Sequence, residues 1–313
     1  MRTNHSVDDS LAAEKQLVLP SYAKINLGLR VIGRREDGYH DIQTVFQQIS
    51  LHDTVRLRVR ESPGTRIDIT ADVPGLPTDH RNLAYRAAER ILARCPRPVH
   101  VEIALQKRIP MGAGLGGGSS NAAVVLLGLA HLMPISLSPE ELQDLAVGLG
   151  ADVPFFIVGG TALAEGIGER LQAIAPVLTN QWIVVVAPPI HIATKWAYAN
   201  LKIPLTTVKK KINLHRFFLS GDEQVHWRLE LINDFERVVF RAFPQLREIK
   251  EMLYEKGAVY ASLTGSGSAV YGIYHKEVDA LAGVACFQQH YPTYLARPVR
   301  WGIRELGSHS SNG

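Results

Sequence analysis

A glycine-rich stretch offers the clearest chemistry in this sequence of 313 residues, because five glycines fall between Gly112 and Gly118. Ser119 and Ser120 follow, and the apolar run 121–132 predicts a buried helix that begins at or just after these serines. Glycines allow the backbone to turn its N–H groups toward a ligand, and a helix N-terminus attracts anions. The pattern therefore favours a phosphate site, with a tight structural turn as the alternative.

The order of residues in this stretch separates the kinds of phosphate-binding loop. A Walker loop needs lysine directly before serine or threonine, whereas Gly118 precedes Ser119 here. Gly112, Gly114 and Gly117 do match the Gly-x-Gly-x-x-Gly fingerprint of dinucleotide sites. That fingerprint should follow a strand at once and lead to a second strand that ends in an acid, and the sequence meets neither condition. An NAD-dependent oxidoreductase is therefore a minor alternative.

Two charged residues interrupt apolar segments. Lys24 lies in the predicted strand 17–32, where a buried ammonium group needs a carboxylate or phosphate partner. Asp152 precedes an apolar run, and its carboxylate could accept a proton as a general base. The residues alone leave two structural alternatives open, namely Asp152 as a cap before a strand and Lys24 as an edge lysine. Asn26 follows Lys24 by two residues, so both lie on one face of the strand.

A polar turn and a second glycine loop are the other candidate binding segments. Tyr39 and His40 end the turn 34–40, and together they offer a stacking face and a hydrogen-bonding edge for a flat base. His40 has no partner at metal-ligand spacing, so no zinc site is predicted. The segment 265–268 carries two glycines before a predicted strand, which indicates either a ligand loop or a plain hairpin loop.

The elements that must position these residues mix strands and helices without strict strand–helix–strand alternation, which favours an α+β fold. Ser138 is a predicted N-cap, with Glu141 completing a capping box, and that helix should end near Gly148 or Gly150. Strands are predicted at 17–32, 54–60, 99–105, 182–187, 258–263 and 269–274, and further helices at 121–132, 194–201 and 244–256.

Length and composition indicate a globular protein of about two domains. A boundary between Ala164 and Gln181 would give two comparable domains. We predict a flexible N-terminus at 1–16, domains at 17–165 and 166–305, and a flexible tail at 306–313. The two cysteines are far apart, which fits a reducing compartment, and the cytoplasm is the predicted location.

Charge and hydropathy exclude several function classes. The formal net charge is only +4, and the basic run 209–211 lacks interleaved aromatic residues, so no nucleic-acid partner is predicted. The longest apolar stretch, 124–135, is interrupted by His131 and Pro134 and is too short to span a membrane. Charge and hydropathy therefore indicate neither a nucleic-acid partner nor a membrane span.

Several motifs together carry a resemblance to a known family. The run PMGAGLGGGSSNAA, from Pro110, resembles the ATP-binding loop of the GHMP kinases. SYAKINLGL, RREDGYHDIQTVF, GADVPFF, GGTALAEGIGE and GSGSAVYG, in that order along the chain, resemble one branch of that superfamily. The DGYH sequence after AKINL discriminates the branch, because the glycine loop alone fits any GHMP kinase. The resemblance covers about residues 17–301.

The resemblance implies a two-domain GHMP kinase fold with the active site in the cleft between a nucleotide-binding N-terminal domain and a smaller C-terminal domain. It implies transfer of the γ-phosphate of ATP to the 2-hydroxyl of a cytidine-diphosphate-linked methylerythritol, in non-mevalonate isoprenoid synthesis. Asp152 would be the base and Lys24 its partner. Mg²⁺ is an implied cofactor, for which no direct protein ligand is predicted, and a monomer or homodimer is expected.

The matched motifs also imply the binding residues, with Thr194 and Tyr198 on a less distinctive segment than the others. The nucleotide is expected at Asn82, Lys107, Pro110, Gly112, Ala113, Gly114, Leu115, Gly116, Gly117, Gly118, Ser119 and Ser120. The substrate is expected at Asn26, Tyr39, His40, Thr194, Tyr198, Gly265, Ser266 and Gly267. Two further alternatives stay open: a GHMP kinase that acts on another alcohol, and an inactive binding protein with this fold.

Overall fold

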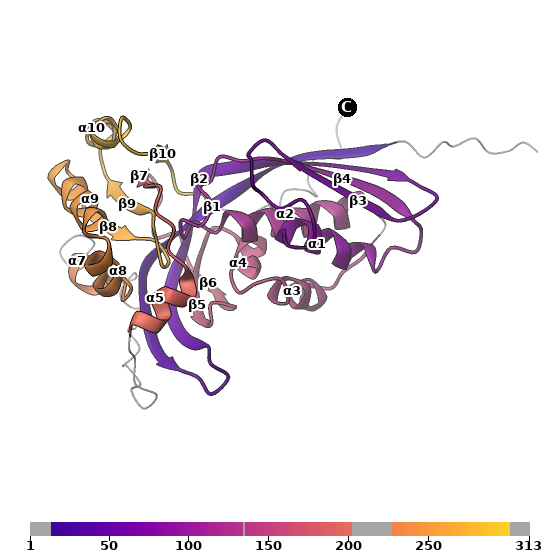
Figure 1. The fold of residues 1–313 in the computed structure, drawn as a ribbon, viewed down its shortest axis with the longest axis horizontal. Helices are drawn as coiled ribbons and strands as arrows, with labels where there is room; N and C mark the ends of the chain where they lie inside the picture. The colour runs from indigo at the N-terminus through magenta and orange to yellow at the C-terminus, as the bar shows by residue number, and fades with distance from the viewer. Residues whose placement is uncertain (1–13, 134, 202–226, 301–313) are drawn as a thin grey trace, which may run out of the picture.

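The structure is a computed structural model that describes residues 14–133, 135–201 and 227–300, and two sheets organise them (Figure 1). The first sheet contains β1 (Lys15–Arg34), β2 (His40–Glu61), β3 (Arg66–Ala71), β4 (Val99–Gln106), β5 (Thr161–Gly166) and β6 (Arg170–Ala173). The second sheet contains β7 (Trp182–Val186), β8 (Tyr260–Leu263), β9 (Val270–Tyr274) and β10 (Thr293–Ala296). The described strands pair antiparallel, except that β3 and β4 are parallel. The predicted α+β class is confirmed.

One long hairpin, β1 with β2, runs through both halves of the molecule (Figure 1). The sequence predicts only 54–60 of β2, whereas the strand begins at His40. Residues 42–49 are buried on both faces, so the alternation that reveals a half-buried strand is absent there. The predicted turn before His40 is confirmed, and Gly38 closes it with φ +87°.

Four helices pack on one face of the first sheet: α1 (Leu83–Leu92), α2 (Gly117–Leu132), α3 (Pro139–Val147) and α4 (Val153–Val158). The prediction that α2 begins at or after the serines is wrong by a turn. Gly116, with φ +73°, occupies its N-cap, so Ser119 and Ser120 lie inside the first turn. The capping box of Ser138 and Glu141 is confirmed, and α3 ends at Gly148.

The second sheet is covered on both faces, because the apolar side chains of β7 point alternately to one face and to the other. Val184 and Val186 pack in one core with the helices α5 (Thr194–Leu201), α8 (Glu236–Ala242), α9 (Pro244–Glu255) and α10 (Glu277–Phe287). Ile183 and Val185 pack in another core, against Ile25 and Leu27 of β1. The short helix α7 (Trp227–Glu230) joins that second core. Because Ile25 and Leu27 face the second sheet, Lys24 and Asn26 face the opposite way along β1.

Some predictions fall where the structure does not test them. The basic run 209–211 lies outside the described residues, as do residues 1–13 of the predicted flexible N-terminus and the whole predicted tail 306–313. The first sheet continues to Ala173, since β6 pairs with β5. The domain bounds at 17–165 and 166–305 stay predictions.

Candidate active site

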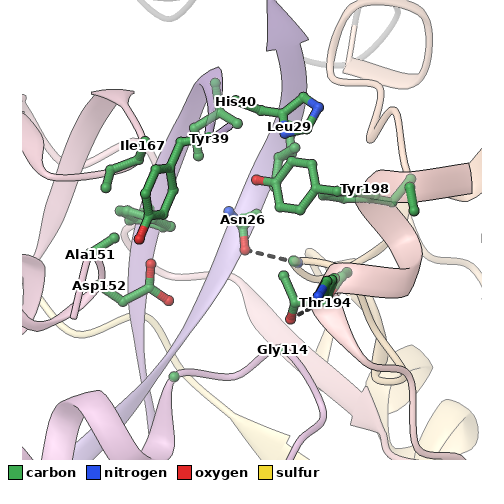
Figure 2. A pocket seen from close by; sticks show the side chains of 18 of the residues that line it. Asn26, Leu29, Tyr39, His40, Gly114, Ala151, Asp152, Ile167, Thr194 and Tyr198 are labelled. Atoms are coloured by element: carbon green, nitrogen blue, oxygen red, sulfur yellow. Dashed lines mark hydrogen bonds between the residues drawn. The ribbon is translucent and has the colours of Figure 1, made fainter. Parts of the chain in front are cut away.

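A pocket of about 800 Å³ lies on the face of β1 that carries Lys24 and Asn26 (Figure 2). Both glycine loops reach it, through Gly114 and Gly116 of the first and through Gly265 of the second. The strand β1, the start of β2, residues 151–152 before α4 and the helix α5 supply most of the other walls, and Ile167 and Phe235 complete them. The pocket therefore collects the segments that the sequence singled out from five distant parts of the chain.

Lys24 and Asn26 form the floor of the pocket. The Lys24 ammonium donates to Asn26 Oδ1 at 2.7 Å, as expected for two residues on one strand face. Only 4% of the Lys24 side chain is exposed, and its Nζ lies 5.0 Å from the centre of the Phe46 ring. Burial lowers the pKa of Lys24 below its usual value, while the nearby Asp152 opposes that change. The ammonium is thus a buried charge at the floor of the pocket.

Asp152 faces Lys24 from the start of α4. Its Oδ2 lies 3.7 Å from Lys24 Nζ, and 34% of its side chain is exposed. The residue occupies the N-cap of α4, but its carboxylate makes no capping hydrogen bond to the helix. The structural alternative of a capping side chain is therefore wrong, and the carboxylate is open to a ligand in the pocket.

Aromatic side chains line the outer part of the pocket. Tyr39 and Tyr198 lie on opposite sides of it, and 60% of Tyr39 is exposed (Figure 2). His40 stacks on Tyr198 with ring centres 4.6 Å apart and planes 18° apart. Burial, followed by the charge of Arg34, lowers the pKa of His40, which favours the neutral ring. Burial and the nearby Asp152 raise the pKa of Tyr198 to about 12.

The second glycine loop closes against the floor and against the first loop. Gly265 N donates to Asn26 Oδ1 at 2.9 Å, and Thr264 Oγ1 donates to Gly114 O at 3.1 Å. A Cβ on Gly114 would lie 2.2 Å from Thr264 O, so only glycine allows the two loops to approach this closely. Thr194 Oγ1 lies 3.2 Å from Ser266 Oγ. The segment 265–268 is thus the loop of the β8–β9 hairpin, as the structural alternative had it, and it also contacts the first glycine loop.

The first glycine loop presents an uncapped helix end. The N-cap of α2 is a glycine without a side chain to cap the helix, and the first backbone hydrogen bond there is from Ser120 N to Gly116 O, at 2.9 Å. Ser120 is buried, and its hydroxyl accepts from Ser21 Oγ at 2.8 Å. Ser119 is only partly buried. The free N–H groups of 117–119 suit an anion.

Asn82 and Lys107 lie outside this pocket and have protein partners. Asn82 caps α1, because its Oδ1 accepts from Ala84 N at 3.0 Å. The Lys107 ammonium pairs with Asp53 and donates to Asn121 Oδ1 at 3.0 Å. Pro110, Gly112, Ala113, Leu115, Gly117, Gly118, Ser119, Ser120 and Gly267 also lie outside the pocket lining.

Comparison with known proteins explains this arrangement. The profile of the GHMP kinases N terminal domain matches residues 82–160, and that of the GHMP kinases C terminal domain matches 222–293. A protein of Citrifermentans bemidjiense named 4-diphosphocytidyl-2-C-methyl-D-erythritol kinase is 42% identical over 266 residues, which covers 85% of this chain and 92% of that one. The chain belongs to this family of GHMP kinases.

Solved structures extend the comparison to the fold of the GHMP kinases. A crystal structure of 4-(cytidine 5'-diphospho)-2C-methyl-D-erythritol kinase is 35% identical with a TM-score of 0.75, covering 90% of this chain and 99% of that one. Homoserine kinase from Cytophaga hutchinsonii shares the fold with a TM-score of 0.70 at 19% identity, covering 94% and 97%. The predicted two-domain GHMP kinase fold is confirmed, and the oxidoreductase alternative is wrong.

Within this GHMP kinase site, the sequence prediction missed residues that hold the predicted ones. Thr44 accepts from Asn26 Nδ2 at 3.0 Å, and Asn233 Nδ2 donates to Gly265 O at 2.9 Å. Asp53 accepts from the backbone N–H groups of Arg108 and Ile109. A buried polar residue in a strand is the one signal that could have revealed Asp53 or Thr44.

Two absences hold for the part of the chain that the structure describes. None of the helices in that part of the chain is long and apolar enough to cross a membrane. The described residues also contain no group of three or more histidine, cysteine, aspartate or glutamate side chains placed to hold a metal ion.

Proposed function

We propose that this chain transfers the γ-phosphoryl group of ATP to the 2-hydroxyl group of 4-diphosphocytidyl-2-C-methyl-D-erythritol, in non-mevalonate isoprenoid synthesis. The observation that carries the proposal is one pocket in which Lys24 and Asp152 lie between a glycine loop and an aromatic wall. The relatives' name supports the substrate. Phosphoryl transfer requires an aligned nucleophile, a proton acceptor and compensation of negative charge, and this pocket offers groups for each.

Asp152 is the proposed general base. Its exposed carboxylate accepts the proton of the 2-hydroxyl as the oxygen attacks the γ-phosphorus, and such a base contributes typically ~10²- to 10⁴-fold. The Lys24 ammonium, 3.7 Å from the carboxylate, offsets the negative charge on the transferring group.

The proposed nucleotide site is the loop from Pro110 to Ser120. The N–H groups of 117–119 at the α2 N-terminus would bind phosphate oxygens, since the helix dipole favours an anion there. Asn82 and Lys107 remain predicted nucleotide contacts beside it. Mg²⁺ takes oxygen ligands and keeps several waters, and when bound to the phosphates it offsets their charge. The hydroxyl of Ser119 is partly exposed and fits such a cation better than the hydroxyl of Ser120, which accepts a hydrogen bond from Ser21 Oγ.

The proposed cytosine site lies at the aromatic end of the pocket. A flat base would stack between Tyr39 and the His40–Tyr198 pair, with the imidazole edge of His40 available for a hydrogen bond. Thr194 and the loop of Gly265, Ser266 and Gly267 would then face the remainder of the substrate. These assignments place the 2-hydroxyl end near Asp152.

The test is ADP release by the purified protein with Mg-ATP, measured with 4-diphosphocytidyl-2-C-methyl-D-erythritol, mevalonate, homoserine or no acceptor. We expect saturable release with the cytidine compound alone. Turnover of mevalonate or homoserine instead would support a kinase for another alcohol, which the fold shared with homoserine kinase keeps as the second candidate. ATP binding without turnover of any acceptor would support a non-catalytic binding protein.

Location and assembly stay predictions beside this proposal. We infer a cytoplasmic enzyme from the composition, acting on small molecules without a nucleic-acid or membrane partner. Its oligomeric state is proposed to be a monomer or a homodimer.

A further inference from the structure

The side-chain amide of Asn26 lies where both halves of the pocket meet. Asn26 is 1% exposed, and its Oδ1 accepts from Lys24 Nζ at 2.7 Å and from Gly265 N at 2.9 Å. Thr264 Oγ1 adds a third, longer contact to Oδ1 at 3.3 Å. Figure 2 shows Asn26 at the floor of the pocket with one such hydrogen bond drawn. One amide oxygen therefore joins the lysine to the second glycine loop.

An asparagine amide has two nearly equal shapes that differ by a half-turn, with oxygen and nitrogen exchanged. In the reversed orientation Asn26 would direct N–H groups toward the Lys24 ammonium and the Gly265 N–H. Three donors would then face one another in a buried place, which is costly because each loses its acceptor. The hydrogen bonds at the pocket floor therefore require the amide orientation in which Oδ1 points toward Lys24 and Gly265.

Thr44 occupies the other end of this amide. Asn26 Nδ2 donates to Thr44 Oγ1 at 3.0 Å, and Thr44 Oγ1 lies 2.5 Å from Gly28 O. A carbonyl oxygen can only accept, so the single hydroxyl proton of Thr44 is committed to Gly28. Thr44 Oγ1 can then only accept a hydrogen bond from Asn26. The reversed amide would place its oxygen there, and an oxygen that also can only accept disfavours that orientation.

The carbonyl of Gly28 is available because β1 carries a bulge at this point. The register passes from Leu27 opposite Val45 to Leu29 opposite Thr44, which leaves Gly28 out of the ladder. Gly28 has φ +69°, and a Cβ there would lie 3.2 Å from Leu231 Cα, so a side chain is disfavoured on both counts. The bulge thus supplies the acceptor that fixes the Thr44 proton.

We propose that Thr44 is a positioning residue that fixes the Asn26 amide and thereby holds the Lys24 ammonium toward Asp152. This inference rests on the function proposed above, since it assigns Lys24 a part in the reaction. Thr44 is 0% exposed and does not line the pocket, so it acts through Asn26 rather than on the substrate.

The consequence for Lys24 follows from what surrounds it. Within the described residues, the groups that face it are Asp152 from α4, Asn26 from its own strand and the Phe46 ring from β2, with the Tyr198 hydroxyl of α5 near Asp152. Burial already lowers the pKa of Lys24. Loss of the Asn26 oxygen would lower that pKa further, because the ammonium would lose its nearest acceptor.

The experiment compares Thr44→Val with Thr44→Ser and with a matched control. Valine keeps the shape of threonine and removes the hydroxyl, whereas serine keeps the hydroxyl. Thr161→Val is the control, because Thr161 is also buried and its Oγ1 donates to the Gln47 side chain at 2.8 Å, outside the pocket lining. The readouts are kcat, KM for both substrates, the pH dependence of kcat, and unfolding in urea.

For Thr44→Val we expect kcat to fall by about 10-fold or more, in the range that an unsatisfied buried polar group produces. The alkaline limb of kcat should move to lower pH, and KM for ATP should stay within about twofold. Thr44→Ser should keep the wild-type kcat and the wild-type position of the alkaline limb of kcat. Thr161→Val should destabilise the protein to a similar extent while leaving kcat and the limb unchanged.

Amine labelling of Lys24 against pH, followed by mass spectrometry, gives a readout that needs no turnover. Its midpoint should move to lower pH in Thr44→Val alone. Equal kcat, limb and midpoint in the Thr44→Val and Thr161→Val variants would overturn the inference, whereas an inactive wild type would contradict the proposed function instead. If the valine variant fails to fold, Thr44→Cys, which keeps the size with a weak acceptor, is measured in its place with the same expected shift.

Discussion

Two lysine side chains in this molecule are almost equally buried, with Lys24 4% exposed and Lys107 5% exposed, yet their surroundings differ. Lys107 pairs with Asp53, whose side chain is fully buried. That carboxylate also accepts from Arg108 N at 2.7 Å, from Ile109 N at 2.8 Å and from Asn121 Nδ2 at 3.0 Å. The acceptor capacity of Asp53 is filled by protein groups.

The carboxylate beside Lys24 is in the opposite condition. Asp152 is one-third exposed, stands 3.7 Å from the ammonium and lines the pocket. The nearest acceptor of Lys24 is instead a neutral amide, Asn26 Oδ1 at 2.7 Å. A buried pair with a saturated carboxylate fastens two parts of the fold together. A pair with an open carboxylate retains capacity for a substrate, so the Asp53 carboxylate is saturated by the fold and the Asp152 carboxylate is the one available to the proposed reaction.

The largest expected effect is on the reactive pair. Asp152→Asn keeps the shape of the side chain and removes the proton acceptor, so kcat should fall by at least about 100-fold. The free energy of unfolding should change by about 1 kcal/mol or less, because the side chain is partly exposed. Steady-state kinetics and urea unfolding measure both quantities. Turnover within a few-fold of wild type would mean that Asp152 is not the base.

The next largest effect is expected at the pair of Lys107 and Asp53, with a large loss of stability and a small loss of kcat. Asp53→Asn leaves the Lys107 ammonium buried without a counter-charge, which typically destabilises by about 3–5 kcal/mol. The kcat of the folded protein should fall by much less than in Asp152→Asn. Urea unfolding with kinetics on the same preparation checks both.

A double variant sharpens this result. Asp53→Asn combined with Lys107→Met removes both charges, so most of the lost stability should return, since replacing both partners of a buried pair is often close to neutral. If the double variant is no more stable than Asp53→Asn alone, the ion pair is not the source of the loss. If Asp53→Asn abolishes turnover without destabilising the fold, the distinction between the two lysines is wrong.

Much of the reactive half of this comparison could be predicted from the sequence, because its signals are local. Lys24 and Asn26 share a strand face, which requires only the period of two, and the structure joins them by a hydrogen bond. The glycines before an apolar run indicated the helix N-terminus at which the phosphate site is predicted. The start of α2 was misplaced by a turn because glycine is a poor interior helix residue, whereas Gly117 and Gly118 lie in the first turn here.

The contacts between distant segments could not be predicted in either half, since their partners lie far apart along the chain. Asp53 reaches Lys107 across 54 residues, and Asn26 reaches Gly265 across 239. No local pattern encodes such pairings. The stacking of His40 on Tyr198 was also missed, because the sequence pairs His40 with its neighbour Tyr39, whereas the hairpin brings it beside α5. The substrate contacts assigned by resemblance stay predictions.

The smallest expected effect concerns stability against pH and isolates the charge of Lys24. Burial lowers the pKa of Lys24 in the folded protein, and Asp152 only partly opposes this, so the unfolded chain, with an ordinary lysine pKa near 10.5, holds this proton more tightly. Between the two pKa values the unfolded state binds more protons, and stability therefore rises with pH.

Lys24→Met removes this titration. Relative to that variant, wild type should be least stable below the folded-state pKa and should gain stability as pH rises toward about 10.5. Urea unfolding of both proteins from pH 7 to 10.5 measures the difference. Parallel stability curves would show that the folded protein does not depress the pKa of Lys24. That result would remove the charge of Lys24 from the difference between the two sites.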